Sequence, residues 1–256
     1  MSSNRSHMKR QELDLRIAKA INNNETEKLR NLIVDEGANP SDYLFHACES
    51  NKIECTLELI RLGADVNVKR EAPPSNIVRI DVYPTILLIA IKKREIDLIK
   101  VLIQHGACVD PITGSNVCPL LRAAGQGDLD IVKLLIQNGA DVNSKGIAGR
   151  TTLHGVIEFH PTNCIEIMEI LLKNGASVNA LDNCNCSPLH HAAKIGNVKI
   201  ARFLVENGCN IHITSKIEDQ AIHLAASRGA REYVDVVKFL ISCGANVNSS
   251  TKWGYT

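Results

Sequence analysis

The chain has 256 residues, of which 45% are hydrophobic and 22% are charged, a composition typical of a globular protein with a sizeable core. Its 29 Lys and Arg nearly balance its 28 Asp and Glu, so the net charge gives no reason to expect nucleic acid or an anionic membrane as partner. No apolar run approaches the roughly 20 residues that cross a bilayer, and the first ten residues lack the apolar segment of a secretory signal.

The N-terminal stretch MSSNRSHMKR gives little structural signal. His7-Met8 resembles a cloning scar, so residues 1–7 are left out of the fold prediction as a tag remnant, and residues 1–12 are expected to form a tail. The first helical pattern follows in "IAKAI" and "TEKLRNLI", within residues 13–39. The polar "NNNETEK" between them fits a terminal repeat that turns one face to solvent.

A five-residue phrase then recurs along the chain. It reads GADVN at Gly63, GACVD at Gly106, GADVN at Gly139, GASVN at Gly175, GCNIH at Gly208 and GANVN at Gly244. The steps between these glycines are close to 33 residues, with short insertions. A fixed period of this size indicates an array of repeats, which we expect to fill residues 13–256 as about seven copies and the start of an eighth.

The helical signals lie between the phrases. In "LDIVKLLIQNGA", Ile131, Leu134 and Leu135 form one apolar stripe, and Gly139 can take the left-handed conformation that ends a helix. Pro119 and Pro188 suit a first helical turn. The alanine pairs 123–124, 192–193 and 225–226 are small enough to let neighbouring helices approach closely. Each repeat is therefore predicted to be two antiparallel helices followed by a projecting β-turn.

A second motif keeps step with the first. It reads TTLHGV at Thr151, SPLHHAA at Ser187 and QAIHLAA at Gln220, with divergent forms at Thr85 and Cys118. These stretches resemble the T-P-L-H-x-A signature of ankyrin repeats, and the resemblance covers about residues 13–248. It implies an all-α ankyrin-repeat solenoid of stacked helix-turn-helix units. It also implies that His154, His190 and His223 hydrogen-bond the backbone of adjoining turns.

No signal for chemistry accompanies the repeats. The sequence has no phosphate-binding glycine loop, no G-x-S-x-G and no His-Glu-x-x-His, so we expect no enzyme activity. Cys184 and Cys186 lack a second ligand pair at zinc spacing, and no metal or cofactor is expected. The nine cysteines are an odd number, which favours free thiols in a reducing compartment, the cytoplasm or the nucleus.

The array departs from its period at three places. About ten extra residues lie within Val68–Thr85, where Pro73-Pro74 breaks any helix and "NIVRIDVY" alternates like a strand, so Val68–Tyr83 is predicted to form a projecting hairpin. Three-residue insertions fall near Glu158–Asn163 and Gly229–Asp235. Such insertions can be neutral surface drift. Phe159, His160 and Tyr233 favour a binding role, because aromatics are common at binding hot spots and rare in this chain.

The resemblance also implies where a partner would bind, namely a concave groove lined by the first helix of each repeat and by the turns. Its exposed positions carry more basic than acidic residues, so the expected partner is a protein or extended peptide of acidic character, bound by a monomer. The candidate partner-binding residues are Arg70, Arg79, Tyr83, Lys92, Lys93, Arg94, Gln126, Arg150, Phe159, Lys194, Ile195, Arg228 and Trp253.

Two other functional interpretations stay open from the sequence. The array can be the substrate-recruiting portion of a larger enzyme, such as a kinase or a ubiquitin-ligase adaptor, or a structural spacer. The final "STKWGYT" matches the opening of an eighth repeat, so we expect the sequence to be a fragment of a longer protein. The partner itself cannot be named from a scaffold that binds unrelated targets.

Overall fold

The computed structural model describes residues 2–69, 85–111, 118–229 and 231–254. It divides into two compact units, an N-terminal unit Met1–Ser115 and a C-terminal unit Asn116–Thr256. Within the described residues the regular structure is helical, apart from an isolated antiparallel bridge between Lys69 and Thr85. The predicted all-α repeat class is therefore confirmed.

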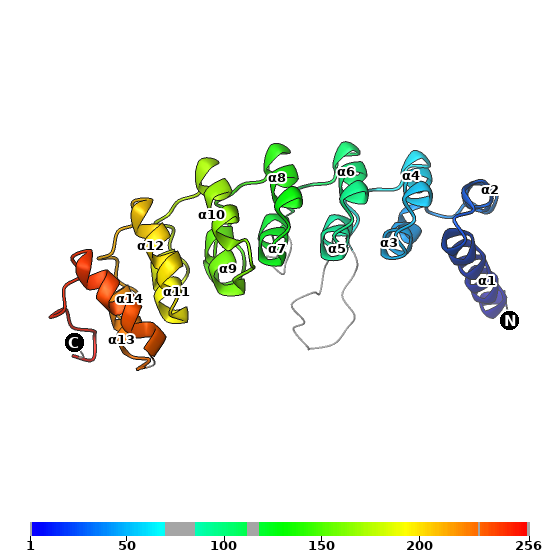
Figure 1. The fold of residues 1–256 in the computed structure, drawn as a ribbon. Helices are drawn as coiled ribbons and strands as arrows, with labels where there is room; N and C mark the ends of the chain where they lie inside the picture. Colours follow the sequence, from blue (N-terminus) through cyan, green and yellow to red (C-terminus); the bar gives the residue numbers. More distant parts are fainter. Residues whose placement is uncertain (1, 70–84, 112–117, 230, 255–256) are drawn as a thin grey trace. The chain divides into compact units, whose positions relative to one another are not determined.

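The N-terminal unit contains three helix pairs, and in Figure 1 the first and second helices of the pairs form two rows. The first helices pack against one another in chain order, as do α2 and α4. Helix α1 begins at Ser2 and so includes residues 2–12 of the expected tail. The pairs are α1 (Ser2–Asn22) with α2 (Thr26–Glu36), α3 (Ser41–Glu49) with α4 (Ile53–Arg61), and α5 (Ile86–Lys93) with α6 (Ile96–Gln104).

The C-terminal unit contains four helix pairs with the same internal order, and a short 3₁₀ turn at Ile147–Gly149. Helices α7, α9, α11 and α13 pack in one row, while α8 packs on α10 and α12 on α14 in the other. The pairs are α7 (Pro119–Gln126) with α8 (Leu129–Gln137), α9 (Thr152–Phe159) with α10 (Cys164–Lys173), α11 (Pro188–Ile195) with α12 (Val198–Glu206), and α13 (Ala221–Ala226) with α14 (Arg231–Ser242).

Small residues bring the first helices close together. The pairs Ala123–Ala124 and Ala192–Ala193 are fully buried in the C-terminal unit. At Gly155 the approach is closer still, because an added Cβ would lie 2.0 Å from the Cδ1 of Leu121 on α7. In the second row Ile131 and Leu135 are buried and Leu134 is half-buried, as the apolar stripe predicted. The core is therefore a continuous aliphatic layer between the two rows of each unit.

The glycine that opens the recurring phrase ends the second helix of each repeat. All seven such glycines have positive φ: Gly37, Gly63, Gly106, Gly139, Gly175, Gly208 and Gly244. The residue after each donates its N–H to the carbonyl five residues earlier, as Ala140 does to Leu135 at 3.0 Å. This Schellman bonding uses carbonyls that the helix leaves without partners. The left-handed conformation predicted for Gly139 is confirmed, with a φ of 88°.

Three histidines join consecutive repeats, which confirms the role that the resemblance implied. Nδ1 of His154 accepts the Thr151 backbone N–H at 3.2 Å, so the ring proton is on Nε2, which donates to the Cys186 carbonyl at 3.1 Å. His190 and His223 bond in the same way. Each ring thereby fixes the start of its own helix and the loop of the following repeat.

Asparagine side chains make a second set of bonds between repeats. The amide of Asn143 donates to the Gly175 carbonyl at 2.9 Å and accepts from the Ser177 N–H at 2.8 Å. Asn67 and Asn179 bond the next turn through the same two atoms. Because both ends of the amide are used, each asparagine sets the separation of two neighbouring turns.

Replacing Gly139 by valine should reduce stability through backbone strain. An added Cβ there would meet no atom within 4 Å, so the cost comes from the positive φ, which β-branched residues tolerate poorly. We expect a loss of about 1–3 kcal/mol for Gly139→Val in urea unfolding. Gly139→Asn, which tolerates this conformation better, should lose clearly less. Equal midpoints for the parent and Gly139→Val would contradict the assignment.

Acid should destabilise the fold through the buried histidines. Burial, with a smaller contribution from His191, lowers the pKa of His154 from 6.5 to about 4. The unfolded chain therefore binds the proton more tightly, so the stabilisation is complete above about pH 6.5 and is lost as the pH falls toward 4. Between about pH 7.5 and 5 the parent should lose on the order of 2 kcal/mol more than His154→Gln.

The measurement is denaturant unfolding of both proteins at several pH values. Carboxylates also titrate in acid, but they do so equally in both, so the difference isolates His154. His105→Gln serves as the control, because His105 is exposed on the end of α6. If His154→Gln shows the same pH dependence as the parent, the buried neutral imidazole is not the source.

Candidate partner-binding face

Three of the predicted partner-binding residues of the N-terminal unit lie at the end of α5. Lys92, Lys93 and Arg94 are all exposed there. The ammonium of Lys93 donates to the backbone carbonyl of Glu49 on α3, so this side chain also joins two repeats. Arg70, Arg79, Tyr83 and the predicted hairpin lie outside the described residues, although the bridge between Lys69 and Thr85 pairs the residues that flank this insertion.

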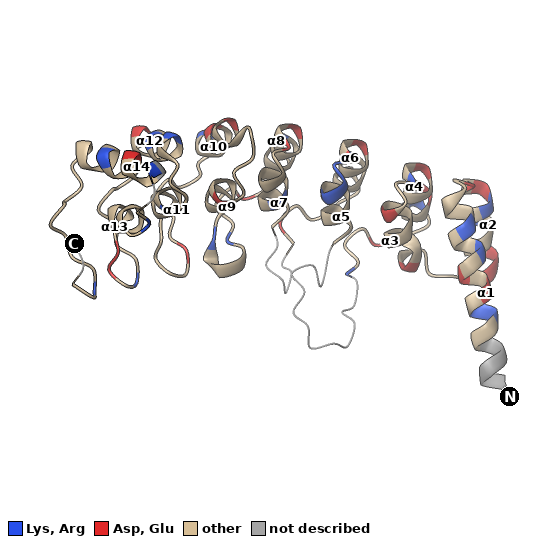
Figure 2. Ribbon diagram, turned by 60° about the horizontal axis from the view of Figure 1, so that its bottom comes forward, with Lys and Arg blue, Asp and Glu red and all other residues tan. Residues whose placement is uncertain are grey.

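In the C-terminal unit we define the inner face as α7 together with residues 144–159, 180–195, 213–228 and 249–253, that is, the first helices and the loop tips before them. The inner face carries seven Lys and Arg against four Asp and Glu. The second helices α8, α10, α12 and α14 carry six of each. Figure 2 shows both signs of charge along the second helices and in the loops that precede the first helices.

One predicted cation is already paired. A guanidinium nitrogen of Arg150 lies 2.6 Å from Oε2 of Glu158, and both side chains are about two-thirds buried. The positive charge expected at Arg150 is therefore largely compensated within the protein. Sequence reasoning placed Arg150 on the groove but could not show that Glu158 faces it.

The carboxylate of Glu158 also approaches His191, and His191 in turn contacts the buried carboxylate of Asp182. Nδ1 of His191 lies 3.3 Å from Glu158 Oε1, and Nε2 is 3.1 Å from Asp182 Oδ2. Burial acts to raise the pKa of Asp182, but hydrogen bonds from the Cys186 N–H, His191 and the Cys184 N–H outweigh it, and the net shift is downward. Sequence reasoning missed His191 and Asp182. The second histidine of "LHHAA" was the available signal, because that position faces the loop of its own repeat.

Phe159, which the sequence predicts as a partner-binding residue, is the last residue of α9. The residue is 64% exposed, yet its ring lies against Gly125 of α7, where an added Cβ would be 2.7 Å from Phe159 Cδ2. Gln126, the next predicted residue, is half-buried at the end of α7. The glycine therefore provides a flat support that holds the ring with one side open to solvent.

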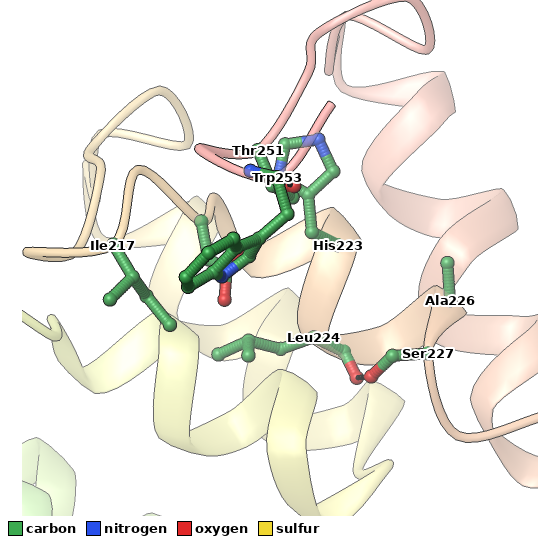
Figure 3. A pocket seen from close by; sticks show the side chains of 8 residues that line it. Ile217, His223, Leu224, Ala226, Ser227, Thr251 and Trp253 are labelled. Atoms are coloured by element: carbon green, nitrogen blue, oxygen red, sulfur yellow. Dashed lines mark hydrogen bonds between the residues drawn. The ribbon is translucent and has the colours of Figure 1, made fainter. Parts of the chain in front are cut away.

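On the next two repeats, Lys194 and Arg228 are exposed and Ile195 is half-buried. Trp253, at the last described loop tip, is 69% exposed and lines a cavity with Ile217 and Leu224 (Figure 3). The structure thus brings Phe159, Lys194, Ile195, Arg228 and Trp253 onto the inner face of one unit.

The two short insertions are docked onto neighbouring repeats. Asn163 donates to the Gly127 carbonyl at 2.8 Å, and the Asn197 amide lies 2.7 Å from His160 Nε2. Tyr233 stacks on Gly196 and donates to the Lys194 carbonyl at 3.2 Å. His160 and Tyr233 therefore contribute packing between repeats, and Phe159 is the aromatic residue that the insertions leave open to solvent.

A family model described as ankyrin repeats (3 copies) matches residues 75–146 and again residues 148–251. The chain belongs to the ankyrin repeat family. No curated protein matches it. Ankyrin repeats are generally modules of protein–protein interaction and are typically not enzymes.

The described residues lack the features of a metal site and of a membrane-spanning helix. No group of three His, Cys, Asp or Glu side chains there is arranged to hold a metal ion. In the same part of the chain, no helix combines the length and the apolar character needed to cross a bilayer. All nine cysteines are free, and burial raises the pKa of Cys48 to about 12, which makes its thiol unreactive.

In this ankyrin chain, Arg94 occupies the position between the two helices of a repeat where a glycine is expected. The equivalent positions include Gly127 and Gly196, and all three residues have positive φ. An arginine with a φ of 62° is strained, since its Cβ is close to backbone atoms in the left-handed region. Strain of this kind often marks a position retained for function.

Replacing Arg94 by glycine should therefore stabilise the protein. We expect Arg94→Gly to raise the free energy of unfolding by about 1 kcal/mol, because glycine adopts positive φ without steric cost. Arg94→Ala keeps the Cβ and removes the same charge, so it should not stabilise. Urea unfolding of the three proteins tests this. If Arg94→Gly is no more stable than Arg94→Ala, the backbone strain at this position is negligible.

Proposed function

We propose that this chain binds a partner protein through the first-helix side of its repeats, and that the contacted segment of the partner is extended and acidic. The observation that carries the proposal is Phe159, an aromatic side chain that is held against Gly125 while 64% of it remains exposed. A pre-positioned aromatic ring loses little conformational freedom on binding, which is why such residues are frequent hot spots.

The distribution of charge supports the acidic partner. The excess of Lys and Arg is confined to the inner face, whereas the second helices of the same unit are balanced. Lys194 and Arg228 are exposed close in sequence to the ends of α11 and α13. Such a field favours encounter with an acidic segment and disfavours basic ones. In the N-terminal unit, Lys92 and Lys93 are exposed at the end of α5 and belong to the first-helix side of that unit.

The proposed binding protein works as a monomer without metal or cofactor. Its free thiols suit a reducing compartment, the cytoplasm or the nucleus. Neither nucleic acid nor membrane is proposed as a ligand, since the chain is close to neutral as a whole.

Cross-linking mass spectrometry in native lysate tests the proposal with paired variants. The test variant combines Phe159→Ser, Lys194→Glu and Arg228→Glu on the inner face. The control combines Lys173→Glu and Lys199→Glu, which make the same charge changes at exposed positions of α10 and α12. Proteins cross-linked to the parent should be retained by the control and reduced about tenfold or more for the test variant.

Circular dichroism melting establishes that both variants are folded, which the exposure of all five residues predicts. Partners that cross-link equally to the parent and to the test variant would show that recognition takes place elsewhere on the chain.

A further inference from the structure

The side chain of His191 on α11 lies between two carboxylates. Its Nε2 is 3.1 Å from Oδ2 of Asp182, in the loop before α11, and its Nδ1 is 3.3 Å from Oε1 of Glu158, on α9 of the preceding repeat. The side chain of His191 is 6% exposed and that of Asp182 is 5% exposed. A group that can change its charge therefore links two neighbouring repeats in a place that is largely closed to water.

The two ring nitrogens of His191 have different surroundings. Oδ1 of Asp182 accepts the N–H groups of Cys184 at 2.8 Å and of Cys186 at 2.9 Å, which hold this carboxylate in place. Because an ionised carboxylate only accepts hydrogen bonds, Nε2 carries a proton and donates it to Oδ2. Nδ1 is buried and, among the described residues, has no hydrogen-bond partner. A neutral ring thus turns the Nδ1 lone pair toward Glu158, whereas a second proton replaces this repulsion by a charge-assisted hydrogen bond.

Other titratable groups near the ring do not compete for this proton. The ring of His154 lies edge-on to that of His191 at 5.0 Å, and burial lowers its pKa to about 4, so it is largely neutral above about pH 5. On α11 itself, burial also lowers the pKa of His190, and Lys194 is exposed. Among the described residues, α12 and α13 pack on α11 but place no ion-pair partner on the ring. The two carboxylates therefore control the charge of His191.

The net charge of the cluster depends on the protonation of the ring. A guanidinium nitrogen of Arg150 lies 2.6 Å from Oε2 of Glu158, so one permanent cation accompanies the two carboxylates. With a neutral ring the cluster has one negative charge in excess, and with a protonated ring its charges are balanced. Because these side chains are mostly buried, salt screens the imbalance less than it would at the surface.

We propose that His191 forms a pH-sensitive contact between these two repeats. With protons on both ring nitrogens, the imidazolium binds Glu158 and Asp182 together. When Nδ1 gives its proton to water, the ring keeps Asp182 and releases Glu158, which then has Arg150 as its remaining partner. Histidine ordinarily makes this change between about pH 5 and 8.

The contact lies beside the residue that carries the proposed function. Glu158 directly precedes Phe159 on α9, and its side chain is 27% exposed, so a negative charge released there reaches the inner face. An acidic partner segment would then be bound more tightly at the acid end of the range than at the alkaline end. This consequence rests on the proposed function, whereas the contact itself is a property of the folded chain.

Nitrogen-15 NMR of the histidine rings between pH 5 and 8.5 tests the contact without any partner. The signals of His191 are assigned by their absence from His191→Gln. In the parent, Nδ1 should lose its proton while Nε2 keeps its own. In Glu158→Gln, which keeps the shape of the side chain and removes its charge, the loss should occur at a pH lower by about one unit. Glu169→Gln, at an exposed position of α10, should not move it measurably.

A second measurement asks whether the change reaches the inner face. Phenylalanine is replaced throughout by 4-fluorophenylalanine, and the fluorine signal of Phe159 is assigned from Phe159→Leu. His160 is exposed next to Phe159 and titrates as well, so the measurement uses a His160→Gln background. In this background the Phe159 signal should change over the same pH range as the ring of His191. The change should disappear when His191→Gln is added.

The opposite results overturn the proposal. His191 that titrates at the same pH in the parent and in Glu158→Gln does not share its proton with that carboxylate. A Phe159 signal that titrates equally without His191 excludes any transmission to the inner face. Should Glu158→Gln fail to fold by circular dichroism, Arg150→Gln replaces it. Loss of that cation should move the titration of His191 to higher pH, and an unchanged titration would refute the contact. None of these outcomes depends on a partner, so a failure of the proposed function in the cross-linking experiment is a separate result.

Discussion

The hydrogen bond from His154 Nε2 to the Cys186 carbonyl joins the start of one first helix to the loop of the next repeat. The same bond recurs from His190 to Asp219 and from His223 to Ser249. A pair of short helices cannot bury its own apolar surface, so each repeat depends on its neighbour for burial. The histidines also fix how each repeat is aligned with the next. They specify which loop carbonyl lies above which helix start, and so they position the loop tips that form the inner face.

Loop position decides what the inner face can present. The ring of Phe159 lies against Gly125 while the residue stays 64% exposed, and His223 joins the two loops that carry Ile217 and Trp253. In both cases a structural contact between repeats leaves an apolar side chain exposed in a fixed place. The scaffold and the proposed binding surface therefore use the same contacts, and a change that loosens the repeats would also disorder the surface.

The sequence predicted the features that each repeat carries within itself. The glycine at position 139 and its equivalents, the buried alanine pairs and the helix starts at Pro119 and Pro188 follow from local steric rules. The candidate site was less accessible, because its contacts cross between repeats. The pairing of Arg150 with Glu158, the contact of His191 with Asp182 and the stacking of Tyr233 on Gly196 all depend on how neighbouring repeats are aligned. No periodicity of the sequence encodes that alignment residue by residue.

The asparagines between repeats have a consequence for the chemical ageing of this protein. Spontaneous hydrolysis of the Asn143 side-chain amide would replace the Nδ2 donor by a carboxylate oxygen 2.9 Å from the Gly175 carbonyl. Two acceptors would then face each other where a donor and an acceptor now meet, while the bond from the Ser177 N–H could persist. The replacement of one nitrogen atom by oxygen would thus remove one hydrogen bond between two repeats and leave each helix pair intact. Within the C-terminal unit, one deamidated residue would thus loosen the alignment of two neighbouring turns without a change inside either helix pair.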